Sequence, residues 1–73
     1  MKGGEQVNTN LLKAKIVENG DTQAQLAAAL GISASNMNDK INGKSDFRQN
    51  EIVAIKNRYS LTADDVDRIF FDQ

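Results

Sequence analysis

The sequence predicts an all-α domain built from five short helices. Apolar residues recur three and four positions apart in five successive segments, which is the spacing of one helix face. No segment alternates apolar and polar residues as a half-buried strand does. Proline is absent, and Gly, Asn, Asp, Ser or Thr residues bound the segments. The predicted helices cover residues 9–19, 22–30, 33–42, 49–59 and 62–71.

The first predicted helix follows a polar stretch, residues 1–8, which we expect to form a flexible tail. Leu11, Leu12, Ile16 and Val17 recur at helical spacing and are expected to form its apolar face. The pair Asn19–Gly20 suits its C-terminal end, because glycine adopts the left-handed conformation that often closes a helix.

The second and third predicted helices follow each other almost directly. Thr22 and Gln25 have the spacing of a capping box, in which each side chain accepts or donates a hydrogen bond at the helix start. Gly31 ends the second helix, and Ser33 is a favourable N-cap for the third. Ala27 is small enough to lie where the two helices cross. This arrangement predicts a tight turn and a steep angle between the helices.

The last two predicted helices differ in how clearly they begin. Arg48 is a poor N-cap, so the start of the fourth helix is defined only to about two or three residues. Thr62 is a good N-cap for the fifth helix, and Asp64 and Asp65 suit its positively polarised first turn. Val66, Ile69 and Phe70 form its inner face.

The composition excludes several classes of protein. The 73 residues suffice for one small domain, and no second domain and no pocket for a small-molecule effector are expected. The chain has no Cys and no His, so disulfides, thiolate metal sites and the commonest general base are absent. We therefore expect no enzyme activity, no metal and no cofactor. No apolar run approaches the length of a membrane span, which favours a cytoplasmic protein without membrane contact.

The net charge of −1 conceals an uneven distribution. Residues 40–58 carry five basic and two acidic side chains, a net charge of +3, whereas residues 62–73 carry one basic and four acidic side chains, a net charge of −3. A basic middle of this kind could dock on phosphate while the acidic end stays away from it.

Three sequence segments at fixed spacing carry a family resemblance: QAQLA at 23–27, LGIS at 30–33 and INGK at 41–44. With them, residues 9–71 resemble the lambda repressor/Cro-like (XRE-type) helix-turn-helix family, and are similar to small phage-derived Cro and repressor proteins of Gram-positive bacteria. The resemblance implies a five-helix DNA-binding domain with its helix-turn-helix motif at residues 22–43. It also implies that the recognition helix, residues 33–42, enters the major groove.

Carried over position by position, the resemblance assigns two sets of DNA contacts. The residues implied to face base edges are Ser33, Ala34, Ser35, Asn38 and Asp39. The residues implied to contact phosphate are Thr22, Gln23, Asn42, Lys44 and Arg48. Members of this family usually bind as homodimers, here either in solution or only on DNA. The residues expected to form the dimer contact are Val66, Phe70 and Phe71, in the apolar last helix.

One departure from the family pattern affects base reading. Many relatives carry Gln or Arg in the first turn of the recognition helix, where this chain has small residues. Sequence reading would then depend on Asn38, on Asp39 accepting from a cytosine amino group, and on Ala34 touching a thymine methyl. Asp39 could instead pair with Lys40 or Lys44 on the surface.

The predicted function is that of a sequence-specific transcriptional regulator, a Cro-like phage or prophage repressor that acts by occupying an operator. Two alternatives remain. An antitoxin-type autoregulator would use residues 1–8 as an arm for a protein toxin. A domain of the same fold devoted to protein–protein interaction is favoured by the net charge of −1 and by Asp39. Phe71 is either a flap over the core or a dimer contact.

Overall fold

The computed structural model describes residues 7–71, and every regular element in that part of the chain is helical. The elements are α1 (Thr9–Glu18), α2 (Gln23–Leu30), α3 (Ala34–Ile41), α4 (Gln49–Arg58), α5 (Ala63–Val66) and the π-helical turn η1 (Asp67–Phe71). The predicted all-α class is therefore confirmed. The observed ends of α1 to α4 and the start of α5 differ from the predicted ones by at most one residue, because the predicted ranges include capping residues.

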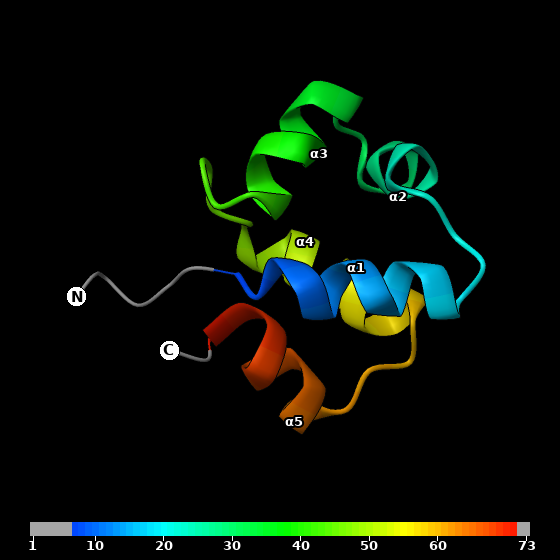
Figure 1. Ribbon diagram of the computed structural model, residues 1–73, viewed down its shortest axis with the longest axis vertical. Coiled ribbons are helices and arrows are strands. Elements are labelled where there is room, and N and C mark those ends of the chain that lie inside the picture. Colours follow the sequence, from blue (N-terminus) through cyan, green and yellow to red (C-terminus); the bar gives the residue numbers. More distant parts are fainter. Residues whose placement is uncertain (1–6, 72–73) are drawn as a thin grey trace.

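The helices are arranged so that α2 and α3 lie together at one end of the molecule and α5 lies at the other (Figure 1). α2 packs against both α3 and α4, and α1 packs against η1. All these elements except α5 contribute buried side chains to a single core, together with Tyr59 and Leu61 after α4. The buried core residues are Leu12, Ile16, Leu26, Ala27, Met37, Ile41, Ile52, Ile55, Tyr59, Leu61, Ile69 and Phe70. Val17, expected on the apolar face of the first helix, is instead 75% exposed.

The last helix differs from the single α-helix predicted for residues 62–71. After one α-helical turn in α5, the chain widens into the π-helical turn η1. The sequence neighbours Ile69 and Phe70 are both buried there. Local spacing alone does not distinguish a π-turn from an α-turn.

The domain begins earlier than the predicted tail allows. Val7 packs against the core, and the backbone N–H of Asn8 donates to the carbonyl of Ile69 at 2.6 Å. The Asn8 side chain also accepts from the N–H of Leu11, so Asn8 is the N-cap of α1. Val7 and Asn8 therefore belong to the folded domain, and the remainder of the predicted tail lies outside the described residues.

Side-chain caps define where most helices start. The cap residues whose side chains accept from a backbone N–H in the first turn are Asn8, Thr22, Ser33 and Thr62. α4 uses a different device: its N-cap is Arg48, and the Glu51 carboxylate accepts from the Arg48 N–H at 2.8 Å. The acceptor thus comes from the third helical residue rather than from the cap itself, and the helix forms despite a poor cap residue.

Three residues, 31–33, connect α2 to α3. Gly31 closes α2 with a φ of 74°, in the left-handed region that glycine enters without steric cost. The next N–H, that of Ile32, donates back to the carbonyl of Ala27 at 3.0 Å, which satisfies the end of α2. Ser33 then caps α3 directly. As predicted, Ala27 is buried, with 1% of its surface exposed.

Candidate functional site

The outer face of α3 carries short polar side chains. Met37 and Ile41 are fully buried and anchor the opposite face of the helix to the core. Ser35 and Asn38 are exposed, and Asp39 is half-buried. Because residues on one face of a helix recur every three to four positions, these side chains point away from the anchoring pair.

The two other residues predicted to face base edges lie at the start of α3. Ser33 and Ala34 are exposed. The Ser33 hydroxyl accepts from the N–H of Asn36 at 3.0 Å, so its oxygen serves as the helix cap. Its hydroxyl proton stays available as a donor, since a hydroxyl can accept and donate at the same time.

The residues predicted to contact phosphate fall into two places. Thr22 and Gln23 begin α2; Thr22 is exposed and its hydroxyl accepts from the Gln25 N–H at 3.0 Å, whereas Gln23 is half-buried. Asn42 and Lys44 are exposed in the connection after α3. This connection folds back on the helix, because the Lys44 N–H donates to the Asp39 carbonyl at 2.8 Å.

Arg48 lies farther along the same connection and is exposed at the N-terminus of α4. Lys44 and Arg48 are thus exposed cations in the connection that leads from α3 to α4. The structure places the predicted base-facing residues along α3 and the predicted phosphate residues at the start of α2 and in the connection after α3.

Asp39 forms none of the ion pairs found within residues 7–71. The surface pairing of Asp39 with Lys40 or Lys44 is therefore not formed. Its backbone carbonyl is used twice, by the N–H groups of Lys44 and Ser45. The carboxylate is consequently a negative charge at the outer edge of α3 without a cation in contact.

Lys40 has a structural role that the sequence analysis did not assign. Its ammonium lies 3.1 Å from Glu51 Oε1 and donates to the Asp46 carbonyl at 2.9 Å. It also lies 5.9 Å from the centre of the Phe47 ring. Only 11% of the Lys40 side chain and 7% of the Glu51 side chain are exposed. Lys40 and Glu51 are eleven residues apart and lie in different helices, so no local spacing indicates this pair.

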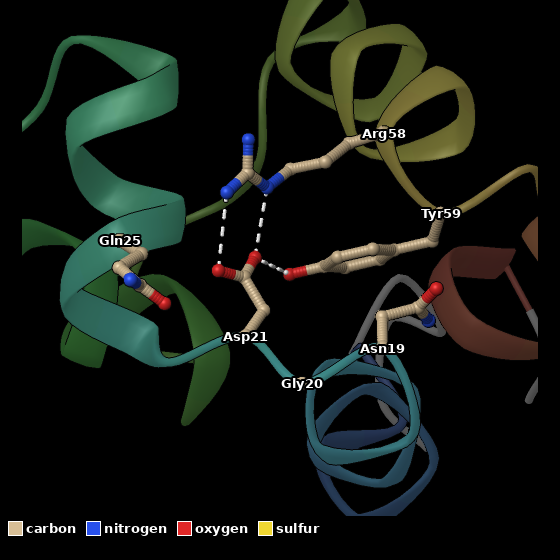
Figure 2. A pocket seen from close by; sticks show the side chains of 6 residues that line it. All are labelled: Asn19, Gly20, Asp21, Gln25, Arg58 and Tyr59. Carbon is tan, nitrogen blue, oxygen red and sulfur yellow. Dashed lines mark hydrogen bonds and ion pairs between the residues drawn. The ribbon is translucent and has the colours of Figure 1, made fainter.

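A second polar cluster joins the start of α2 to the end of α4 (Figure 2). Asp21 accepts from Arg58 through both carboxylate oxygens, at 2.8 and 3.1 Å, and from the Tyr59 hydroxyl at 2.6 Å. The Asp21 side chain is 7% exposed and the Arg58 side chain 38%. Asn19, Gly20 and Gln25 complete the wall of the open pocket around the cluster.

The ionisation of this cluster is strongly biased. The hydrogen bonds from Arg58 and then from Tyr59 hold the pKa of Asp21 well below its usual range. The Asp21 carboxylate raises the pKa of Arg58. Burial, followed by the hydrogen bond to Asp21, raises the pKa of Tyr59 above its usual value. At neutral pH the cluster holds one carboxylate, one guanidinium and one neutral phenol, which is a structural arrangement rather than an acid–base pair.

Sequence reasoning missed this cluster because its members are 37 and 38 residues apart along the chain. Such a distance leaves no periodic or local signal. The consequence for the site is that the residue preceding Thr22 is fixed to α4, so that the N-terminus of α2 has a defined position.

The residues predicted to form a dimer contact differ in their availability. Phe70 is 4% exposed and packs edge-on against Phe47, with ring centres 5.3 Å apart, so this part of the prediction conflicts with its burial in the core. Val66 is half-buried against the core. Phe71 is 47% exposed. Phe71 ends η1, which follows α5 at the end of the molecule opposite to α2 and α3 (Figure 1).

Within residues 7–71, no group of three or more Asp or Glu side chains is placed to hold a metal ion. Every buried side-chain nitrogen or oxygen in the same part of the chain has a hydrogen-bond partner. No helix between residues 7 and 71 combines the length and the hydrophobicity needed to cross a bilayer.

A family model described as "Protein of unknown function (DUF739)" matches residues 7–73. The chain belongs to this family. No curated protein and no solved structure matches the chain. The family match begins at Val7, which is also the first residue that packs against the core.

Proposed function

We propose that this protein is a sequence-specific DNA-binding regulator of transcription. In this proposal α2 and α3 form a helix-turn-helix motif of the lambda repressor/Cro type, and α3 enters the major groove. The supporting observation is the pair of short helices joined by three residues through a left-handed Gly31, with the outer face of α3 exposed and lined by short polar side chains. Small side chains allow the helix backbone to approach base edges closely.

The surroundings of α3 supply groups for phosphate. Lys44 and Arg48 lie in the connection after α3, and the N-terminus of α2 presents backbone N–H groups beside Thr22 and Gln23. The cluster of Asp21, Arg58 and Tyr59 neutralises the carboxylate next to Thr22, which would otherwise repel phosphate. The proposed protein acts as a homodimer that occupies an operator, as small Cro-like repressors of phages and prophages do.

The test is fluorescence-polarisation titration of labelled duplex DNA at several salt concentrations. Lys44 and Arg48 together neutralise about two phosphates per protomer, which predicts a slope of log K against log salt of about −2 for a monomer and about −4 for a dimer. Lys44→Ala should weaken binding and reduce the slope by about one per protomer. Lys13→Ala removes an exposed charge on α1 and serves as the matched control. Absence of binding at low salt, with the protein folded, would contradict the proposal.

A second candidate function is protein–protein interaction through the same face of α3. The observation that favours it is Asp39, whose carboxylate has no ion-pair partner within residues 7–71 on a face whose neighbouring Lys40 is withdrawn into a buried pair. Such a face would suit a basic partner better than a phosphate backbone. Asp39→Asn distinguishes the two: it should strengthen non-specific DNA binding if α3 faces DNA, and should weaken capture of a basic partner if α3 faces a protein.

A further inference from the structure

Three exposed carboxamides lie in or directly after α3, on more than one side of the helix. They belong to Asn36, Asn38 and Asn42. Their backbone N–H groups are engaged, with that of Asn36 donating to the Ser33 hydroxyl at 3.0 Å. Their side-chain amides form none of the hydrogen bonds found within residues 7–71. Each amide therefore keeps both its donor and its acceptor available.

The one cation of α3 is already bound by other groups of the domain. Lys40 is the only basic residue between Ser33 and Asn42. Its ammonium contacts Glu51 and the Asp46 carbonyl, and its side chain is 11% exposed. Lys40 therefore contributes to the attachment of α3 to α4 and is not free to reach a base.

These two observations bear on which bases α3 can read. In the major groove, Arg and Lys side chains bind guanine through O6 and N7, whereas Asn and Gln bind adenine through N6 and N7. The exposed surface of α3 combines free amides with the absence of a free guanine-reading cation. Resting on the proposed function, we propose that Asn36 and Asn38 are specificity-determining residues that read adenine, so that the recognised half-site contains A·T pairs opposite α3.

Neighbouring side chains support this reading. An Asn side chain is short, so a bidentate contact requires the helix backbone to lie close to the base edges. Ala34 and Ser35, in the first turn of α3, are both small and exposed and permit that approach. Asn36 was not among the base-facing residues predicted from the family resemblance; its exposure and its free amide add it.

The experiment is selection of binding sites from a random duplex DNA library with the unmodified protein, Asn36→Ala, Asn38→Ala and the control Asn57→Ala. Asn57 is an exposed asparagine on α4, so its loss matches the chemical change without altering α3. We expect the unmodified protein and Asn57→Ala to select the same adenine-containing half-site. Each α3 variant should lose the preference for adenine at one position while it keeps the others.

A second measurement tests whether the protein contacts N7 of the selected adenine. Replacing a selected adenine by 7-deazaadenine removes the N7 acceptor and should weaken binding of the unmodified protein about tenfold, within the range of one bidentate contact. The alanine variant that lacks the asparagine contacting this adenine should bind both duplexes equally.

Three outcomes would overturn the inference, and one of them also affects the proposed function. Selection of G·C pairs opposite α3, or an unchanged adenine preference in both α3 variants, contradicts adenine reading while leaving DNA binding intact. Failure of the folded protein to enrich any sequence contradicts the proposed function and the inference together. Circular dichroism establishes that each variant is folded, which is expected because both residues are exposed.

Discussion

The Tyr59 hydroxyl is the part of the Asp21 cluster that can be removed with least disturbance. It donates to Asp21 Oδ2 at 2.6 Å, and Tyr59→Phe deletes this hydrogen bond while keeping the buried ring. Both carboxylate oxygens retain Arg58 as a donor, so no buried acceptor is left without a partner. A hydrogen bond to a charged group contributes about 1.5–3 kcal/mol. The open pocket around the cluster places the expected loss at the lower end, about 1.5 kcal/mol.

This loss should lower the melting temperature by about 6–12 °C in a domain of this size. The assay is thermal and urea unfolding followed by far-ultraviolet circular dichroism. Arg68→Gln is the control, since it breaks the Arg68–Asp64 ion pair at 3.0 Å, in which both side chains are more than half exposed. Exposed pairs of this kind contribute about 0.5 kcal/mol or less. If Tyr59→Phe shifts unfolding no more than Arg68→Gln does, the argument for the cluster is wrong.

The pH dependence gives an independent check of the same contact. The pKa of Asp21 is lowered by Arg58 and Tyr59, so its stabilisation is present above the unfolded pKa of about 3.9 and is lost as pH falls toward the folded value. The pKa of Tyr59 is raised, so its contribution is present below about pH 10 and is lost as pH rises further. The difference in unfolding free energy between the unmodified protein and Tyr59→Phe should be constant between these limits and shrink on both sides. A difference that does not vary with pH would show that the hydroxyl acts independently of Asp21.

Three further predictions concern other parts of the fold. Glu51→Ala should cost about 3 kcal/mol, because it leaves the Lys40 ammonium poorly solvated and without its carboxylate; a loss below 1 kcal/mol in urea unfolding, on the order of a surface pair, would contradict this role. Gly31→Ala should cost about 1–2 kcal/mol from backbone strain alone, because no atom lies within 4 Å of the added Cβ, and a much larger loss in the same assay would reveal a contact that this geometry does not contain. Phe71→Ser should change monomer stability by less than about 0.5 kcal/mol since Phe71 is exposed, and should weaken the proposed homodimer in sedimentation; an undiminished dimer would remove Phe71 from the contact.

The sequence by itself determined the helices and their order. Local rules suffice for this part: the spacing of apolar residues defines each buried face, and Thr22, Ser33 and Thr62 cap helices through hydrogen bonds to N–H groups three residues away. Met37 and Ile41 stand four positions apart, a spacing that predicts one buried face of α3 and an exposed opposite face, and both residues are buried in the structure.

Tertiary structure alone decided how the ends of these helices are held and which charges remain free. Asp21 binds Arg58 and Tyr59, which are about half of the chain away in sequence, and the Lys40 ammonium pairs with Glu51 of α4. The edge-on contact of Phe70 with Phe47 likewise joins two separate segments. Helix spacing and capping depend on neighbours within one turn, whereas an ion pair or a ring contact depends on two segments that only the packed core brings together. The candidate face of α3 could therefore be located from the sequence, but its charge could not.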